Sequence, residues 1–486
     1  QRVVYPTDHM VFLFQNSNRH MIFFILLKGL RLMEKNNNFM GTRPVFPLLM
    51  SMSVPMMLSM LIQSLYNIID SIYVSRLGTQ ALTAVSLAYP LQNAIVSVAV
   101  GIGVGISSAI SIHLGSDNQE KANRAAVIGL ALTIIHCVLF ILAGIFITHP
   151  FLSMFTDNPD VLESACIYTR IVLCFSFGSL LQIAFEKIFQ GIGEMKVTMY
   201  MLTAGCIINI ILDPILIFGL LGFPAMGVAG AAVATVIGQV CSFLLYVAAY
   251  RRKQYAVQLR LHDLVFDRAV IKQIYGVGIP SSIMLLLPSV LISILNSILT
   301  AISEVYVAVL GVYFKLQTFI YMPANGIVQG MRPIIGYNYG AGKRERVKKT
   351  IRYSLLSAAC LMLIGTGLAL LLPGQILSLF KADTELMDAG ITALRVISAG
   401  FLVSSVGLIY AGVFEALGNG RSSLVISLLR QFIITVPLSL ILTRAAGMGA
   451  LGVWISFPAG ELCASAAAVF LLKRYEKGVF NPFFNF

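Results

Sequence analysis

Charged side chains are scarce in this chain. Asp, Glu, Lys and Arg make up only 11% of its 486 residues, whereas 58% of the residues are hydrophobic. A soluble fold of this length cannot bury that much apolar surface, because every globular protein exposes much of its chain to water. The composition therefore excludes an ordinary soluble enzyme or binding domain and indicates an integral membrane protein.

Acidic residues are rarer than basic ones: 21 Asp and Glu stand against 34 Lys and Arg, for a formal net charge of +13. Such an excess can indicate nucleic-acid binding, but here the basic residues lie in short segments between long apolar runs. This placement favours orientation in a membrane, so we expect no nucleic-acid partner.

Motifs of common catalytic chemistry are also missing. The seven cysteines lie singly inside apolar runs, without metal-ligand spacing or the framework of a secreted disulfide-rich domain. The chain has no phosphate-binding Gly-Lys-Ser/Thr sequence and no paired catalytic His and Asp at the ends of its apolar runs. We therefore expect neither an enzyme nor an ATP-driven pump, and no bound cofactor.

The chain repeats itself after 225 residues. This offset places Pro55 over Pro280 and Gly105 over Gly330, and it also aligns residues 91–92 with 316–317. After a small slip, the glycines near 227–230 meet those near 449–452. One offset that holds across several apolar runs indicates two homologous halves around a central path.

Twelve apolar runs of about 20–30 residues are long enough to cross the roughly 30 Å hydrocarbon core of a bilayer. The first half contains 45–75, 82–112, 124–148, 163–190, 196–220 and 226–250, and the second half contains 271–300, 305–337, 351–373, 386–416, 423–443 and 449–472. Six runs per half bring both halves into the membrane from the same side, as parallel repeats. The predicted fold is an all-α integral membrane protein with 12 transmembrane helices in two pseudo-symmetric six-helix bundles.

The loops predict the domain boundaries and the orientation. We expect an N-terminal lobe at 44–250, a linker at 251–270, a C-terminal lobe at 271–475 and a tail at 476–486. Residues 1–43 form a leader that is either peripheral or a mis-assigned start. One set of loops is strongly basic, whereas the opposite set carries only Arg76, Lys381 and Arg444. The positive-inside rule then places both termini and the linker in the cytoplasm, with the chain in the cell membrane.

Polar residues gather in two spans of the first half. In 45–75 they recur at three- and four-residue steps and form one stripe on a helix: Ser59, Gln63, Tyr66, Asn67 and Asp70. In 196–220, Asn209 and Asp213 lie one turn apart, and Pro214 interrupts regular hydrogen bonding beside the acid. Such an acid is either a structural cap or partner, or a cation site; two acids with amide companions favour the cation site.

Five segments carry a resemblance to a known family: 66–78 (YNIIDSIYVSRLG), 189–193 (FQGIG), 209–214 (NIILDP), 313–317 (YFKLQ) and 333–340 (PIIGYNYG). Together they resemble the multidrug and toxic compound extrusion (MATE) family, most closely its DinF-like branch, over about 44–475. The resemblance implies a two-lobed, V-shaped transporter that expels cationic, amphipathic, drug-like compounds in exchange for H⁺ or Na⁺. We expect it to act as a monomer.

The resemblance also assigns residues to roles. The coupling ion, H⁺ or Na⁺, would bind in the first lobe, with Na⁺ placed at Asp213 and Asn209; the implied ion-coupling residues are Tyr66, Asp70, Tyr168, Asn209, Asp213 and Thr235. The implied substrate and gating positions are Pro55, Gln63, Asn67, Lys315 and Gln317. Pro55 corresponds to a proline at which the first span bends in the family. For Lys315, a counter-charge and a side chain that extends to the membrane interface stay equally open.

The two halves differ in their acids. At the 225-residue offset, Asp70 aligns with Leu295 and Asp213 with Leu438. The first half is therefore the expected ion-coupling lobe. A lipid-linked saccharide flippase, from the wider superfamily with this architecture, is the alternative function.

Overall fold

The computed structural model describes residues 38–380 and 384–479, and from Met40 onward the chain forms one compact unit. The predicted leader (1–43) and tail (476–486) lie mostly outside the described residues. The first half contains α2 (Phe39–Thr42), α3 (Val45–Ser75), α4 (Thr79–Gly115), α5 (Gln119–Phe146), α6 (Thr148–Leu152), α7 (Pro159–Cys174), α8 (Phe177–Gly191), α9 (Met195–Phe218) and α10 (Val228–Arg252).

The second half follows the same order after a short 3₁₀ turn. It contains η2 (Leu261–Asp263), α11 (Arg268–Thr300), α12 (Glu304–Gly340), α13 (Arg344–Leu371), α14 (Pro373–Ser378), α15 (Thr384–Ser398), α16 (Phe401–Ala416), α17 (Gly420–Leu428), η3 (Leu429–Ile433), α18 (Thr435–Leu440), η4 (Ile441–Ala445) and α19 (Ala450–Val479). Helices suit these apolar segments because each one satisfies its own backbone hydrogen bonds in the absence of water.

The predicted twelve spans are confirmed. Among the described residues, ten helical segments are each long and apolar enough to cross a bilayer, and two bent helix pairs bring the number to twelve. The bent pairs are α7 with α8, at 45°, and α15 with α16, at 50°. The sequence analysis treats 163–190 and 386–416 as continuous runs, whereas the structure breaks them at Phe175–Ser176 and at Ala399–Gly400, and serine and glycine are residues at which helices bend.

The repeat is visible in the helix boundaries. Helices α4 and α12 begin and end 225 residues apart, as do α5 and α13. The two bent pairs also occupy matching positions. One difference breaks the match: α9 is a regular α-helix, whereas its counterpart in the second half contains the π-helical turns η3 and η4.

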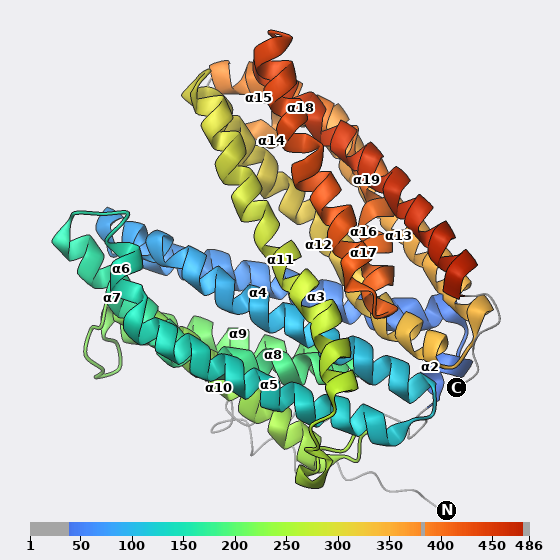
Figure 1. The fold of residues 1–486 in the computed structure, drawn as a ribbon. Helices are drawn as coiled ribbons and strands as arrows, with labels where there is room; N and C mark the ends of the chain where they lie inside the picture. The colour runs from blue at the N-terminus through green and yellow to red at the C-terminus, as the bar shows by residue number, and fades with distance from the viewer. Residues whose placement is uncertain (1–37, 381–383, 480–486) are drawn as a thin grey trace, which may run out of the picture. The chain divides into compact units, whose positions relative to one another are not determined.

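The two halves meet mainly along α3, α4, α11 and α12, where α4 packs against α11 and α3 against α12 (Figure 1). The repeated pair Gly105 and Gly330 lies in these two contacts. A Cβ atom on Gly105 would overlap the backbone carbonyl of Ile274 in α11, and one on Gly330 would lie 2.7 Å from the Cα atom of Ser53 in α3. Glycine is required at both positions because the helix backbones approach so closely.

These contacts lie toward one end of the bundle. We call it the basic end, because Lys and Arg residues such as Lys121, Arg251, Lys253 and Lys343 lie in or beside its loops. These loops join the helices on the side where α3 begins: 116–118, 192–194, 253–267, 341–343 and 417–419. The segment of α4 that packs most closely on the second half, between Gly101 and Gly115, approaches this end. The acid-bearing segments of α3 and α9 lie toward the opposite end.

Candidate functional site

The candidate site lies inside the first half and toward the end opposite the basic loops. Four helices supply its residues: α3 carries Tyr66 and Asp70, α7 carries Tyr168, α9 carries Asn209 and Asp213, and α10 carries Thr235. Helix α9 packs against both α3 and α10, and α10 packs against α7, which brings Tyr168 close to the two acids. All six predicted ion-coupling residues therefore belong to one cluster.

The centre of the cluster is closed to solvent. Asp213 is 0% exposed, while Asn209 and Thr235 are also buried. The Asn209 Nδ2 atom donates to Asp213 Oδ1 at 3.3 Å and to Thr235 Oγ1 at 3.4 Å. Because Asn209 and Asp213 are one turn apart on α9, the helix itself sets their spacing.

The two carboxyl groups face each other. Asp70, which is partly exposed, is a neighbour of Asp213, and Tyr66 is a neighbour of Thr235. Two carboxylates cannot hydrogen-bond to one another unless a proton lies between them, since an ionised carboxylate only accepts. The pair is therefore arranged to share a proton or to bind a cation.

Three oxygens in this cluster lack a donor. Asp70 Oδ1, Asp213 Oδ2 and Asn209 Oδ1 are buried and have no hydrogen-bond partner within the described part of the chain. Unpaired buried acceptors are costly, and the cost falls when a proton or a hard cation arrives. The residues thus suit H⁺ or Na⁺. A conventional metal centre is a poorer fit, since no group of three His, Cys, Asp or Glu side chains gathers among the residues described.

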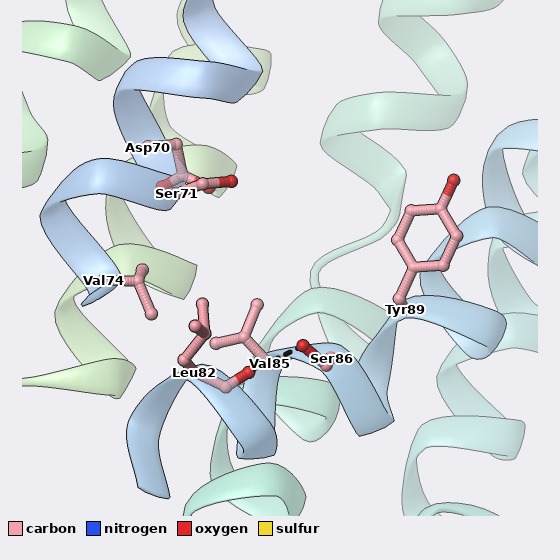
Figure 2. A pocket seen from close by; sticks show the side chains of 7 residues that line it. All are labelled: Asp70, Ser71, Val74, Leu82, Val85, Ser86 and Tyr89. Carbon is pink, nitrogen blue, oxygen red and sulfur yellow. Dashed lines mark hydrogen bonds between the residues drawn. The ribbon is translucent and has the colours of Figure 1, made fainter. Parts of the chain in front are cut away.

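A pocket gives access to Asp70. It has a volume of about 320 Å³ and lies between α3 and α4 (Figure 2), where it is lined by Asp70, Ser71, Val74, Leu82, Val85, Ser86 and Tyr89. Asp70 therefore lies between this pocket and the closed Asp213. The sequence interpretation missed the pocket, because Ser71, Ser86 and Tyr89 are common residues near helix ends and carry no distinctive spacing.

Pro214 disturbs α9 less than the sequence suggests. The helix continues through it to Phe218, so the proline removes one backbone hydrogen bond without ending the helix. Helix α3 likewise runs as one helix through Pro55. Pro55 is buried, and its neighbours Ser53 and Met57 contact Gly330 and Gly326 of α12. It therefore belongs to the contact between the two halves, far along α3 from Asp70.

The remaining predicted positions are not part of the cluster. Gln63 and Asn67 are exposed on α3, whereas Lys315 and Gln317 belong to α12 in the second half. The Lys315 Nζ atom lies 5.7 Å from the ring centroid of Phe380. This contact places it beside the loop after α14 and away from the acids of the first half.

The positions in the second half that match the cluster are apolar. At the 225-residue offset, Tyr66, Asp70 and Tyr168 correspond to Leu291, Leu295 and Ala393, and the later slip brings Phe457 opposite Thr235. All four are buried in one hydrophobic cluster of the second half. The place that holds two carboxyls in one half is therefore filled by hydrocarbon in the other.

Two homologous six-helix halves, with a cluster of two carboxyls buried among the apolar helices of the first half, are the architecture of a multi-pass membrane transporter. The MatE family model matches residues 55–215 and again 280–441, which together cover more than half of the chain at the repeat offset. The chain belongs to the MATE family of transporters, and it is not an enzyme.

Similar proteins cover nearly the whole chain. The multidrug export protein MepA of Staphylococcus saprophyticus is 26% identical over 432 residues, which cover 88% of this chain and 94% of that protein. The probable multidrug resistance protein YoeA of Bacillus subtilis is 28% identical, with coverage of 88% and 92%. A solved structure described as the outward-facing conformation of a multidrug resistance MATE family transporter has a TM-score of 0.85 and 28% identity, and the match covers 92% of this chain and 99% of that one.

Proposed function

We propose that this protein is a multidrug efflux transporter of the cell membrane, which exports cationic amphipathic compounds in exchange for H⁺ or Na⁺. The observation that carries the proposal is the pair Asp70 and Asp213, whose carboxyls face each other at membrane depth with unpaired oxygens. The names of the relatives MepA and YoeA support drug-like substrates. The basic loops support a cytoplasmic basic end.

In this proposal the coupling ion enters through the pocket beside Asp70 and then binds between Asp70, Asp213 and Asn209. Neutralising the carboxyls removes the cost of their burial and their repulsion. Because Tyr66 and Asp70 belong to α3, a change at the site acts on the helix that contacts α12 of the other half. Helix α3 is thus the element through which ion binding reaches the interface between the halves.

Alternating access follows if the ion and the drug prefer different states. The ion would favour the state in which drug is released outside, and the drug would favour the state open to the cytoplasm. Coupling depends on this difference in affinity, since a ligand that binds two states equally shifts neither.

The test uses purified protein in liposomes with a fluorescent cationic dye. Separate pH and sodium gradients should each be imposed, and the expected result is dye movement driven by at least one of them. The proposal would be wrong if neither gradient drove dye transport and the protein flipped a labelled lipid-linked sugar without a gradient. That result would favour the flippase alternative.

A further inference from the structure

The second half contains a buried charged pair that the ion site does not use. Arg430 lies in the π-helical turn η3 and Glu461 lies in α19, with Arg430 Nε 3.7 Å from Glu461 Oε1. This distance is an ion pair but is too long for a hydrogen bond. The two charges attract each other and still leave hydrogen-bonding capacity for a third group.

Two acceptors beside this pair have no donor. Glu461 Oε2 and Gln431 Oε1 have no hydrogen-bond partner within the described residues, and the two residues are only 9% and 6% exposed. Buried side-chain oxygens are nearly always paired, because an unpaired one loses its water without compensation. One of these oxygens belongs to the ion pair itself and the other belongs to the residue that follows Arg430 in the chain, and both indicate a missing donor.

The backbone at this position is unusual. A π-helical turn is rare, and it often accompanies a functional site because it displaces side chains from their regular helical directions. In the first half the position that matches Arg430 is Gly205, in a regular part of α9 that packs closely on Gly238. The charged pair is therefore specific to the second half.

Aromatic residues lie near the pair, because Tyr313 and Tyr321 are close enough to interact electrostatically with both Arg430 and Glu461. The Tyr321 hydroxyl donates to Ser404 Oγ at 2.6 Å, and the Tyr313 ring lies 5.2 Å from that of Phe457, one helical turn before Glu461. The Arg430 side chain is 22% exposed. A guanidinium in contact with lipid at this depth is costly, so its exposed part is expected to face a hydrated interior.

We propose that Arg430, Gln431 and Glu461 form a substrate subsite that selects zwitterionic amphipaths, compounds that carry a carboxylate and an amino group. The guanidinium of Arg430 donates to the carboxylate, and the free oxygens of Glu461 and Gln431 accept from the amino group. A simple monocation satisfies only the acceptors and is repelled by Arg430. The subsite deepens the proposed efflux function and rests on it for its physiological meaning.

The test compares two dyes that differ in one group: rhodamine 110, which has a free carboxylate, and rhodamine 123, its methyl ester. Binding to the purified full chain in detergent is measured by fluorescence polarisation, without any ion gradient. The wild type should bind rhodamine 110 more tightly than its ester. The double variant Arg430→Gln/Glu461→Gln, which leaves no unpaired charge, should reduce the ratio of the two affinities roughly tenfold.

A matched control is Arg444→Gln, which removes an exposed arginine from the same span. It should leave the ratio unchanged. The subsite would be overturned if the double variant kept the wild-type ratio of affinities, including the case in which it bound both dyes more weakly by the same factor. Arg430 and Glu461 would then be a structural pair. If the double variant does not fold, Gln431→Leu alters no charge and is expected to weaken both dyes severalfold; undiminished binding then overturns the proposal.

This experiment separates the two proposals because the affinity ratio needs no transport. Ion gradients that move neither dye, with the affinity ratio intact, would overturn the antiport function and keep the subsite. If an ion gradient drove transport of both dyes and the protein showed no preference for the dye with the carboxylate, the antiport function would stand and the subsite would be overturned.

Discussion

The Asn209 amide lies between Asp213, one turn further along α9, and Thr235 on α10, and it donates to both. Its own carbonyl oxygen has no hydrogen-bond partner among the residues that the structure describes. Asn209 therefore holds the acid in place, and its own acceptor and the Asp213 Oδ2 atom are both buried and free to accept from a further group.

Replacement of Asp213 by Asn should remove ion-coupled transport. The amide keeps the size of the carboxyl but cannot take up a proton or supply the charge that binds a cation, so the rate of dye export under an ion gradient should fall at least tenfold. Transport in proteoliposomes measures it. Asp70→Asn should reduce the rate of dye export less, because the amide introduced at this position can donate a hydrogen bond to Asp213.

The control for these variants is Asp388→Asn, at an exposed position of α15. It makes the same chemical change outside the cluster and should transport like the wild type. Full activity in Asp213→Asn would contradict the assigned role.

The Thr235 hydroxyl should matter through hydrogen bonding and not through its methyl group. Thr235→Val removes the hydroxyl oxygen to which Asn209 donates at a buried site, and the loss of such a hydrogen bond costs about 1–3 kcal/mol. Thr235→Ser restores the hydroxyl and should recover coupling. Thermal unfolding and sodium- or proton-driven dye export, measured on both variants, check this. Equal behaviour of Val and Ser would mean that the hydroxyl has no role.

The contact between α4 and α11 should not tolerate a side chain at Gly105. Gly105→Ala forces the helices apart, and overpacking of this kind destabilises by about 1–3 kcal/mol. The measurement is the midpoint of thermal unfolding. Gly311 on α12 is the control: a Cβ there meets no atom within 4 Å, so Gly311→Ala should leave the midpoint unchanged or raise it.

The pocket beside Asp70 should be reachable from outside the cell. Ser86→Cys places a thiol in that pocket, and a membrane-impermeant maleimide added to intact cells should label it. The naturally exposed Cys360 and Cys463 must first be replaced by alanine. Labelling only after the membrane is opened would reverse the proposed orientation.

Much of the fold is predictable from residue order. A span of about 20 apolar residues has no stable alternative to a helix in a bilayer, so the runs at 82–112 and 305–337 correspond to α4 and α12. Asp70 and Asp213 also stand out in the sequence, because acids are rare in such runs. Their proximity is harder to predict, since it depends on how α3 packs against α9.

The features that the sequence interpretation missed all depend on several helices at once. No proline lies at the bend after α7 or at the bend after α15, and the residue types do not predict the π-helical turn η3. The pairing of Arg430 with Glu461 joins two different helices, and their separation along the chain says nothing about which faces meet.

Residue order alone is enough to predict that this chain spans a membrane as two homologous helical halves and that the two acids Asp70 and Asp213 belong to the first half. Composition and periodicity suffice for this, because the bilayer penalises every unpaired backbone group and every isolated charge. Which side chains meet depends on how the helices pack against one another. The rotation of each helix about its axis is set by close contacts such as Gly105 on Ile274 and Gly330 on Ser53, and these come from packing and not from hydropathy.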